Sequence, residues 1–235
     1  MTRLERALSI DDLRDMACRR LPRSVFEFID GGAEDERTLA DNRHALTRHR
    51  IVPRVLVDVA NPKLDTPIFG HTWAAPFVVS PMGSCVLGWP EADIAIARAA
   101  MAHGIAYTLS TMSTTSIERM ARAVQGRLWF QLYVLKNPSV NDQLVARAQA
   151  AGYEALVVTV DLPVGGKRER DLRNGISIPL RFQGKHLWEG LTHPAWAWQM
   201  LRAGLPEWHE VRTFDMRWHV QQRAAWDHSK NRASS

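Results

Sequence analysis

Arginines and acidic residues crowd into the stretch TVDLPVGGKRERDLRNG, directly after an apolar, strand-like run. A glycine pair, Gly165 and Gly166, separates the apolar run from Arg168 and its charged neighbours. A guanidinium can donate two parallel hydrogen bonds to a planar carboxylate, so Arg168 could bind an acidic small molecule. The plainer interpretation of Arg168 is a solvated charge that pairs with Glu169 or Asp171.

Four apolar runs rich in β-branched and aromatic residues alternate with helical patterns. The runs predict strands at 75–81, 105–110, 127–134 and 154–161, and the patterns between them predict helices at 90–104, 116–123 and 138–152. This alternation is typical of parallel strands joined by helical crossovers, and hence of an α/β fold. Ligands of such folds bind at the carboxyl ends of the strands.

Polar residues cluster at these expected strand ends. They are Ser80, Met82 and Gly83, then Ser110 to Ser113, then Gln131 and Tyr133, and finally Thr159 and Asp161. The set is mostly uncharged, with one cationic loop beside it, which would suit a planar hydrogen-bonding ligand together with an anion. The sequence contains no GxGxxG, GxxxxGK[ST], GxSxG or HExxH motif, so dinucleotide, P-loop, serine hydrolase and zinc peptidase chemistry lack a signature.

Composition narrows the class of protein further. The 235 residues are 46% hydrophobic and 23% charged, as in globular chains, and no apolar run is long enough for a membrane span. No secretory signal is visible, so a cytoplasmic location is expected. The two cysteines, Cys18 and Cys85, form no CxxC pattern, which argues against a metal site and a disulfide framework. A net charge of +5 without an aromatic-basic module argues against nucleic acid as a partner.

The first part of the chain predicts short helices and then extended structure. Ser9 with Asp12 forms a capping-box pattern, and a second helix is expected between Pro22 and Gly31. A Pro-punctuated stretch at 51–73 favours a connector with a small hairpin.

Four motifs together resemble the FMN-dependent α-hydroxy acid dehydrogenase and oxidase family, nearest its mandelate dehydrogenase and L-lactate dehydrogenase branch. They are GGAEDE, LSTMSTTSIE, WFQLYV and the arginine-bearing stretch, and the similarity runs from about Ser9 to about Pro206. The resemblance implies a (β/α)8 TIM barrel with FMN at the carboxyl ends of its strands, here truncated after about four strands. We therefore expect N-terminal helices and a connector at 1–74, a half-barrel at 75–178 and a Trp-rich segment with a disordered tail at 179–235.

By this resemblance, three side chains hydrogen-bond the flavin ring: Ser110, Gln131 and Thr159. The backbone of Pro81, Met82 and Gly83 would run beside the reactive face of the ring. Family members carry Gly or Ala at the position of Gly83, and a missing Cβ there would alter how closely oxygen approaches, which favours a dehydrogenase over an oxidase. The alternative for Ser110 and Thr159 is a structural role in bonding neighbouring backbone.

The resemblance also places three residues at a small 2-hydroxy acid substrate. Arg168 matches a loop arginine that contacts the substrate carboxylate, and Tyr133 matches a catalytic-site tyrosine that supports substrate on the flavin. Phe28 stands where the family usually has a tyrosine that binds the same carboxylate, so one hydrogen bond of about 1.5–3 kcal/mol would be lost.

The family's histidine base lies in an HGGR run, and the 235 residues contain no such run. The family's flavin-binding lysine and phosphate site lie in the same second half of the barrel. We therefore expect the chain alone to be inactive in oxidising an L-2-hydroxy acid to a 2-oxo acid. The alternative is a non-catalytic half-barrel that associates with another chain or with itself, because exposed edge strands favour association.

Six of the nine tryptophans follow residue 180, interleaved with basic residues. This composition suits a segment at a membrane surface, which would place the protein peripherally on the inner face of the cell membrane. From about Phe214 the sequence fits neither the family nor a helix or strand pattern, so a disordered or unnatural tail is the competing expectation.

Overall fold

The computed structural model describes residues 4–161, 165–176, 184–204 and 208 of the chain. Its contacts divide into two compact units. One lies within Met1–Lys63, Leu87–Pro90 and Gly166–Leu205, and the other within Leu64–Val86, Glu91–Gly165 and the segment from Pro206. Each unit is described by itself below.

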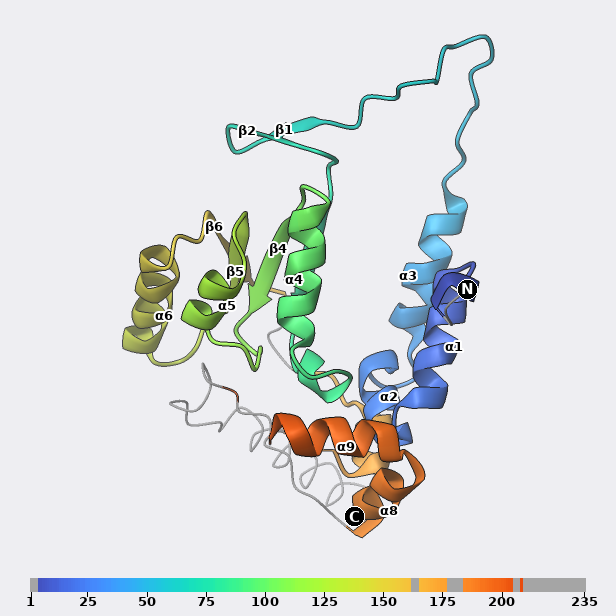
Figure 1. Cartoon of the computed structure of the whole chain (residues 1–235), viewed down its shortest axis with the longest axis vertical. Coiled ribbons are helices and arrows are strands. Elements are labelled where there is room, and N and C mark those ends of the chain that lie inside the picture. Colours follow the sequence, from blue (N-terminus) through green and yellow to red (C-terminus); the bar gives the residue numbers. More distant parts are fainter. Residues whose placement is uncertain (1–3, 162–164, 177–183, 205–207, 209–235) are drawn as a thin grey trace, which may run out of the picture. The chain divides into compact units, whose positions relative to one another are not determined.

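The second unit contains a four-stranded parallel sheet with the order β3-β4-β5-β6 (Figure 1). The strands are β3 (Val78–Met82), β4 (Ala106–Ser110), β5 (Leu128–Tyr133) and β6 (Ala155–Thr159). Helices α4 (Ala92–Ala102), α5 (Ile117–Ala123) and α6 (Pro138–Ala150) connect them in turn. All four strands and all three helices expected from the apolar pattern are therefore confirmed, with boundaries shifted by a few residues.

The core of this unit lies where the helices pack on the sheet. Tyr107, Leu109 and Phe130 from the strands are fully buried with Ile117 and Met120 from α5. Two of the helices begin at side-chain caps, because Ser116 accepts from the Arg119 amide at 3.3 Å and Asn137 accepts from the Ser139 amide at 3.1 Å.

A small hairpin precedes the sheet, as expected. Strands β1 (Thr66–Ile68) and β2 (His71–Trp73) pair antiparallel. The turn contains Gly70 with a positive φ of 77°. The hairpin packs on the sheet through aromatic contacts, in which Phe69 and Trp73 both lie against Trp129 with ring centroids 5.6 and 5.4 Å apart.

The first unit is helical. It contains a 3-10 turn at Leu4–Arg6 and helices α1 (Ile10–Arg20), α2 (Arg23–Asp30), α3 (Arg37–Arg48), α7 (Glu169–Asn174), α8 (Gly184–Thr192) and α9 (Pro194–Ala203). A further 3-10 turn, η2 (Cys85–Leu87), spans a boundary between the units. The capping box is confirmed, since the Asp12 amide donates to Ser9 Oγ at 3.1 Å and the Ser9 amide donates back to Asp12 at 2.9 Å.

Helices α8 and α9 lie in the Trp-rich segment, for which the sequence pattern predicted no helix. The expected tail from Phe214 lies outside the described residues. Within the described part of the chain, no helix combines the length and apolar character that crossing a bilayer requires.

Candidate functional site

Three uncharged side chains form a hydrogen-bonded row across the carboxyl ends of β4, β5 and β6. Ser110 Oγ donates to Gln131 Oε1 at 3.1 Å, and Gln131 Nε2 donates to Thr159 Oγ1 at 2.7 Å. Ser110 and Gln131 are 3% and 1% exposed, while Thr159 is half-buried. We call these three residues the polar row.

The strand register brings the polar row together. Ser110 is the Cα partner of Gln131 between β4 and β5, and Thr159 is the partner of Tyr133, two residues beyond Gln131. Side chains two residues apart on a strand share a face, so Gln131 and Tyr133 project to the same side of β5. The prediction that these strand ends meet is thereby confirmed, while their binding roles stay predictions.

The chemistry of the polar row fits the edge of a flavin ring, which alternates carbonyl oxygens with an N–H group. Gln131 Oε1 accepts from Ser110 Oγ and from the Thr111 amide at 3.2 Å, so Gln131 offers its second Nε2 hydrogen to a ring. The Thr159 hydroxyl, which accepts from Gln131, can donate its own proton. None of the three carries a charge, which suits hydrogen bonding to an uncharged planar ring. In this respect, the residues present fit FMN.

Thr111 is a supporting residue that the sequence analysis did not single out beyond its place in a strand-end run. Its hydroxyl donates to the Gln131 carbonyl at 2.5 Å and accepts from the Tyr133 amide at 3.2 Å. Thr111 therefore ties the end of β5 to the loop after β4. A threonine directly after a strand was the available signal, because such residues often bond neighbouring backbone.

The segment Pro81–Gly83 completes β3 and leaves it at a tight contact. A Cβ added to Gly83 would lie 2.8 Å from Met112 Cβ and 3.3 Å from the Met112 carbonyl oxygen. The Ser84 amide donates to that same carbonyl at 3.1 Å. The absence of a side chain at Gly83 thus allows the loops after β3 and β4 to approach each other.

Tyr133 ends β5 and is half-buried. Burial, with the nearby Asp161 carboxylate, raises the pKa of the Tyr133 phenol. The hydroxyl is therefore protonated at neutral pH and can donate a hydrogen bond.

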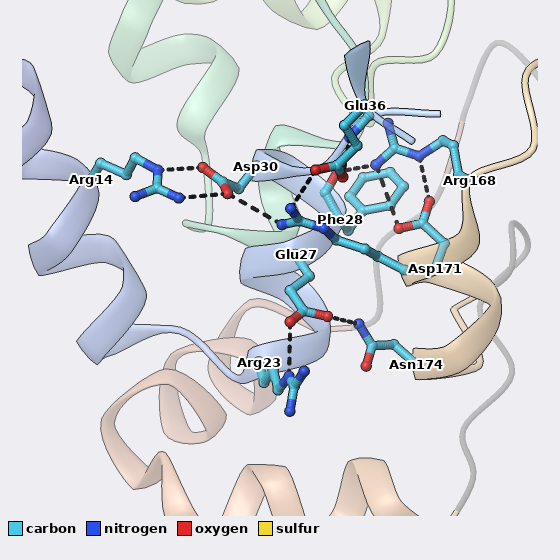
Figure 2. Close-up of polar contacts among 11 residues, drawn as sticks. Arg14, Arg23, Glu27, Phe28, Asp30, Glu36, Arg168, Asp171 and Asn174 are labelled. Atoms are coloured by element: carbon cyan, nitrogen blue, oxygen red, sulfur yellow. Dashed lines mark hydrogen bonds and ion pairs between the residues drawn. The ribbon is translucent and has the colours of Figure 1, made fainter. Parts of the chain in front are cut away.

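Arg168 and Phe28 lie together in the first unit (Figure 2). Arg168 Nε donates to Asp171 Oδ2 at 2.5 Å and Nη2 donates to Asp171 Oδ1 at 3.4 Å. Nη2 also donates to the Phe28 carbonyl, and the guanidinium lies over the Phe28 ring. The pairing with Asp171, which the sequence left open, is present, but the side chains are only 37% and 13% exposed.

This geometry limits how Arg168 could hold a carboxylate. One forked edge of the guanidinium, Nε with Nη2, is already used by Asp171, whereas Nη1 makes no hydrogen bond with any described residue. The sequence suggested two parallel hydrogen bonds from the Arg168 guanidinium to a ligand carboxylate, but in the structure Nε and Nη2 donate such a pair to Asp171. Within the described part of the chain, Nη1 is therefore the nitrogen of Arg168 that is left to bind a carboxylate oxygen.

Further polar contacts beside Arg168, Asp171 and Phe28 hold helix α7 to α2. Arg170 pairs with Glu36 and lies 3.5 Å from Asp30, and Asp30 in turn receives a forked contact from Arg14 at 2.5 and 2.8 Å (Figure 2). Asn174 donates to Glu27 at 2.6 Å. The pair of Arg170 with Glu36 therefore joins the GGAEDE motif to the arginine-bearing stretch.

The predicted site residues thus fall into two groups. Polar side chains and Tyr133 gather at the strand ends of the second unit, together with Pro81, Met82 and Gly83 of β3. Arg168 and Phe28 gather in the first unit. Among the described residues, no group of three or more His, Cys, Asp or Glu is arranged to hold a metal ion.

Parallel α/β sheets bind their ligands outside the carboxyl ends of the strands, which is where the polar row lies. The sequence matches the family pattern of FMN-dependent dehydrogenases over residues 17–233. It is 39% identical to (S)-mandelate dehydrogenase of Pseudomonas putida over 199 residues, which cover 85% of this chain and 50% of that protein. It is 42% identical to L-lactate dehydrogenase of Yersinia pestis (strain Pestoides F) over 195 residues, 83% of this chain and 51% of that protein.

Solved structures agree with the sequence relatives. The crystal structure of the monotopic membrane protein (S)-mandelate dehydrogenase superimposes with a TM-score of 0.84 and 36% identity, covering 93% of this chain and 60% of that one. A mandelate oxidase mutant with (S)-mandelic acid gives a TM-score of 0.70 at 42% identity, covering 73% of this chain and 51% of that one.

The chain belongs to the FMN-dependent dehydrogenase family, whose cofactor is FMN. Its four-stranded sheet corresponds to the first strands of a TIM barrel. The chain spans about half the length of the curated relatives it matches. The expected family, fold class and cofactor are therefore confirmed.

Proposed function

We propose that this chain supplies the flavin-ring contacts and a substrate-carboxylate contact for the FMN-dependent oxidation of an L-2-hydroxy acid to a 2-oxo acid. The observation that carries the proposal is the polar row, in which a nearly fully buried amide, Gln131, joins two hydroxyls across three strand ends. A buried amide in such a place needs partners for all of its donors and acceptors. The edge of a flavin ring would supply those that the protein leaves open.

The roles of the chain's own residues follow from their chemistry. FMN, when bound, would accept the hydrogen and electron pair that leave the substrate α-carbon. Arg168 would bind the substrate carboxylate through Nη1 while Asp171 holds its other edge. Tyr133, with its raised pKa, would keep its proton and donate a hydrogen bond to the substrate oxygen.

Inactivity of the 235-residue chain on its own belongs to the same proposal. A general base contributes about 10²- to 10⁴-fold, and the HGGR run that carries the family's base does not occur in the sequence. We expect FMN to bind saturably but to be lost on gel filtration, and we expect no turnover of 2-hydroxy acids.

A titration with FMN, followed by quenching of flavin fluorescence, tests the proposal. Gln131→Met keeps the size of the side chain and removes both polar atoms, so we expect affinity to fall by about tenfold or more. Gln143→Met is the matched control, since Gln143 lies exposed on α6. Equal affinities of the wild type and Gln131→Met would contradict the proposed ring site.

A second role, contact with a membrane surface, is supported by α8 and α9. Leu187, Trp188 and Leu191 of α8 are 68–72% exposed, and Trp198 and Leu201 of α9 are 60% and 76% exposed. Lys185 and Arg202 flank them, and Arg202 lies over the Trp198 ring. Exposed Trp and Leu beside basic residues suit the interface of an anionic bilayer. We propose that the protein binds the inner face of the cell membrane through this helical pair.

Flotation with phosphatidylglycerol-containing vesicles tests the membrane role. The double variant Trp188→Ser with Trp198→Ser should lose most vesicle binding, whereas Trp89→Ser, which changes an exposed tryptophan outside α8 and α9, should retain it. Equal flotation of all three proteins would overturn the proposal.

Association through the sheet edge is the remaining candidate. Among the described strands, β6 pairs only with β5 and so lies at one edge of the sheet. Its residues Leu156 and Val158 are 43% and 44% exposed. Such an edge can pair with another strand. Analytical ultracentrifugation of the wild type and Val158→Lys tests this, and a wild type that is monomeric at all concentrations would exclude self-association.

A further inference from the structure

A buried carboxylate that the proposed chemistry does not use lies behind the polar row. Asp93 is the second residue of α4 and is 1% exposed. Its Oδ1 accepts from the Tyr107 hydroxyl at 3.0 Å, and its Oδ2 accepts from the Ser113 hydroxyl at 2.7 Å. The Cys85 thiol lies close enough to this carboxylate for the Asp93 charge to raise its pKa further above the value that burial gives it.

The partners of Asp93 are all neutral donors. Among the described residues, no lysine, arginine or histidine forms an ion pair with it, so hydroxyl and thiol groups and the start of helix α4 balance its charge. Burial, reinforced by the Asp93 charge, raises the pKa of Cys85 to about 12 and also raises the pKa of Tyr107. Both groups therefore keep their protons and remain donors at neutral pH.

The two donors and the Cys85 thiol come from different parts of the strand ends. Cys85 lies just after β3, Tyr107 lies within β4, and Ser113 lies in the loop from β4 to α5. A single carboxylate thus connects both loops to the start of helix α4. Burying a carboxylate costs free energy unless each of its oxygens accepts a hydrogen bond, and both oxygens of Asp93 do so.

A series of hydrogen bonds connects Asp93, through Ser113, to Ser110 of the polar row. The Ser113 hydroxyl accepts from the Thr115 amide at 2.9 Å, and the Ser113 amide donates to the Ser110 carbonyl at 3.0 Å. The Met112 amide donates to Ser110 Oγ at 3.1 Å, which orients that hydroxyl toward Gln131. A loop that lost its bond to Asp93 would release Ser110 and the contact of Met112 with Gly83.

We propose that Asp93 is a positioning residue that clamps the loops after β3 and β4, so that Ser110 and Gly83 present a fixed surface to the flavin ring. This inference rests on the proposed function, because the surface it positions is the proposed ring site. A carboxylate is needed because it accepts from every partner, whereas an amide at this place would turn an N–H group toward one of the donors.

The first measurement is hydrogen exchange by mass spectrometry on the 235-residue chain. Asp93→Asn keeps the shape of the side chain, and Ser113→Ala removes the hydroxyl that donates to Asp93 and accepts from the Thr115 amide. We expect both to speed exchange of the Met112 amide, whose acceptor Ser110 neither variant removes, by about tenfold or more, while exchange in α6 stays unchanged. Glu91→Gln is the control, because Glu91 is an exposed carboxylate two residues from Asp93 that pairs with Arg119.

The second measurement is the dissociation constant for FMN of the same proteins. We expect Asp93→Asn and Ser113→Ala to weaken FMN binding by about tenfold and Glu91→Gln to leave it unchanged. Unchanged exchange in the 110–116 loop would overturn the inference, as would faster exchange that spreads equally to α6.

Failure of the inference and failure of the proposed function can be told apart. Faster loop exchange with wild-type FMN affinity would show that Asp93 does not position the ring site, while the ring site itself would stand. A wild-type chain without saturable FMN binding would instead contradict the proposed function and, with it, the inference.

Discussion

The guanidinium carbon of Arg168 lies 5.2 Å from the centroid of the Phe28 ring, and Nη2 of the same arginine donates to the Phe28 carbonyl. Phe28 therefore holds Arg168 in two ways, through its ring and through its backbone. Cation–π contacts of this kind contribute about 0.5–1 kcal/mol at exposed sites and more when desolvated. A residue that resembles a lost substrate contact thus has a structural task of its own.

Phe28→Tyr should preserve both contacts with Arg168 and add a hydroxyl. If Phe28 occupies the family's carboxylate-binding tyrosine position, a bond of about 1.5–3 kcal/mol to the substrate anion is gained, or roughly 10- to 150-fold in kcat/KM. The measurement uses the chain co-expressed with the second half of a family barrel. The gain should vanish with substrates whose carboxylate is esterified. An equal effect on acids and esters would show that Phe28 is a packing residue of α2.

Arg168→Met should raise KM for a 2-hydroxy acid in the same reconstituted enzyme. Loss of one partner of a partly buried charge pair costs about 2–4 kcal/mol, so the increase should exceed about tenfold. Arg173→Met is the matched control, because its side chain is 74% exposed and pairs with Glu169. Identical KM values for both variants and the wild type would assign Arg168 to the ion-pair cluster alone.

Gly83→Ala should disturb the contact between the loops after β3 and β4. The added Cβ would lie 2.8 Å from Met112 Cβ, closer than carbon atoms normally approach, so the loop must move. Overpacking of this kind costs about 1–3 kcal/mol of stability. Urea unfolding measures the loss, with Gly184→Ala as control because a Cβ there meets nothing within 4 Å. A change in neither stability nor FMN affinity would show that the Met112 loop adjusts freely.

The pair of Asp30 with Arg14 should make stability depend on pH. Hydrogen bonds from Arg14 lower the pKa of Asp30, so the pair stabilises the fold above the unfolded pKa of about 3.9 and this contribution is lost as the pH falls through the lower folded value. Asp30→Asn should therefore cost about 0.5–1 kcal/mol near pH 7 and progressively less below about pH 4.

Urea midpoints across this pH range measure the effect of Asp30→Asn. Asp11→Asn makes the same charge change at a carboxylate that is 78% exposed and 3.5 Å from Arg43, and it should shift the midpoints little. A gap between Asp30→Asn and the wild type that stays constant down to pH 2 would contradict the assigned cause.

Much of the second unit follows from local pattern. Apolar runs of strand length alternate with helix-spaced residues, and this alternation was enough to place β3 to β6 and the helices between them. The capping signal at Ser9 in the first unit acted over three residues, which is why it was visible in the sequence. Ser110, Gln131, Tyr133 and Thr159 could be grouped because parallel strands bring their carboxyl ends to one edge.

Helices α8 and α9 were not predicted, although Leu187, Trp188 and Leu191 of α8 stand at the three- and four-residue spacings of an amphipathic helix. The role of Asp93 was equally hidden. An aspartate at a helix start normally indicates a favourable dipole contact with solvent around it, and nothing nearby in the sequence shows that Tyr107 and Ser113 bury it.

By itself, the sequence determined the family, the alternating α/β order and the residues that end each strand, because these depend on neighbours within a few positions or on spacing along one chain. Tertiary structure decided what those residues contact. Arg168 gives one edge of its guanidinium to Asp171 and Phe28, Gly83 lies against Met112, and Asp93 joins two loops. Phe28 with Arg168 and Gly83 with Met112 are residues far apart in the chain, and local patterns carry no record of such long-range contacts.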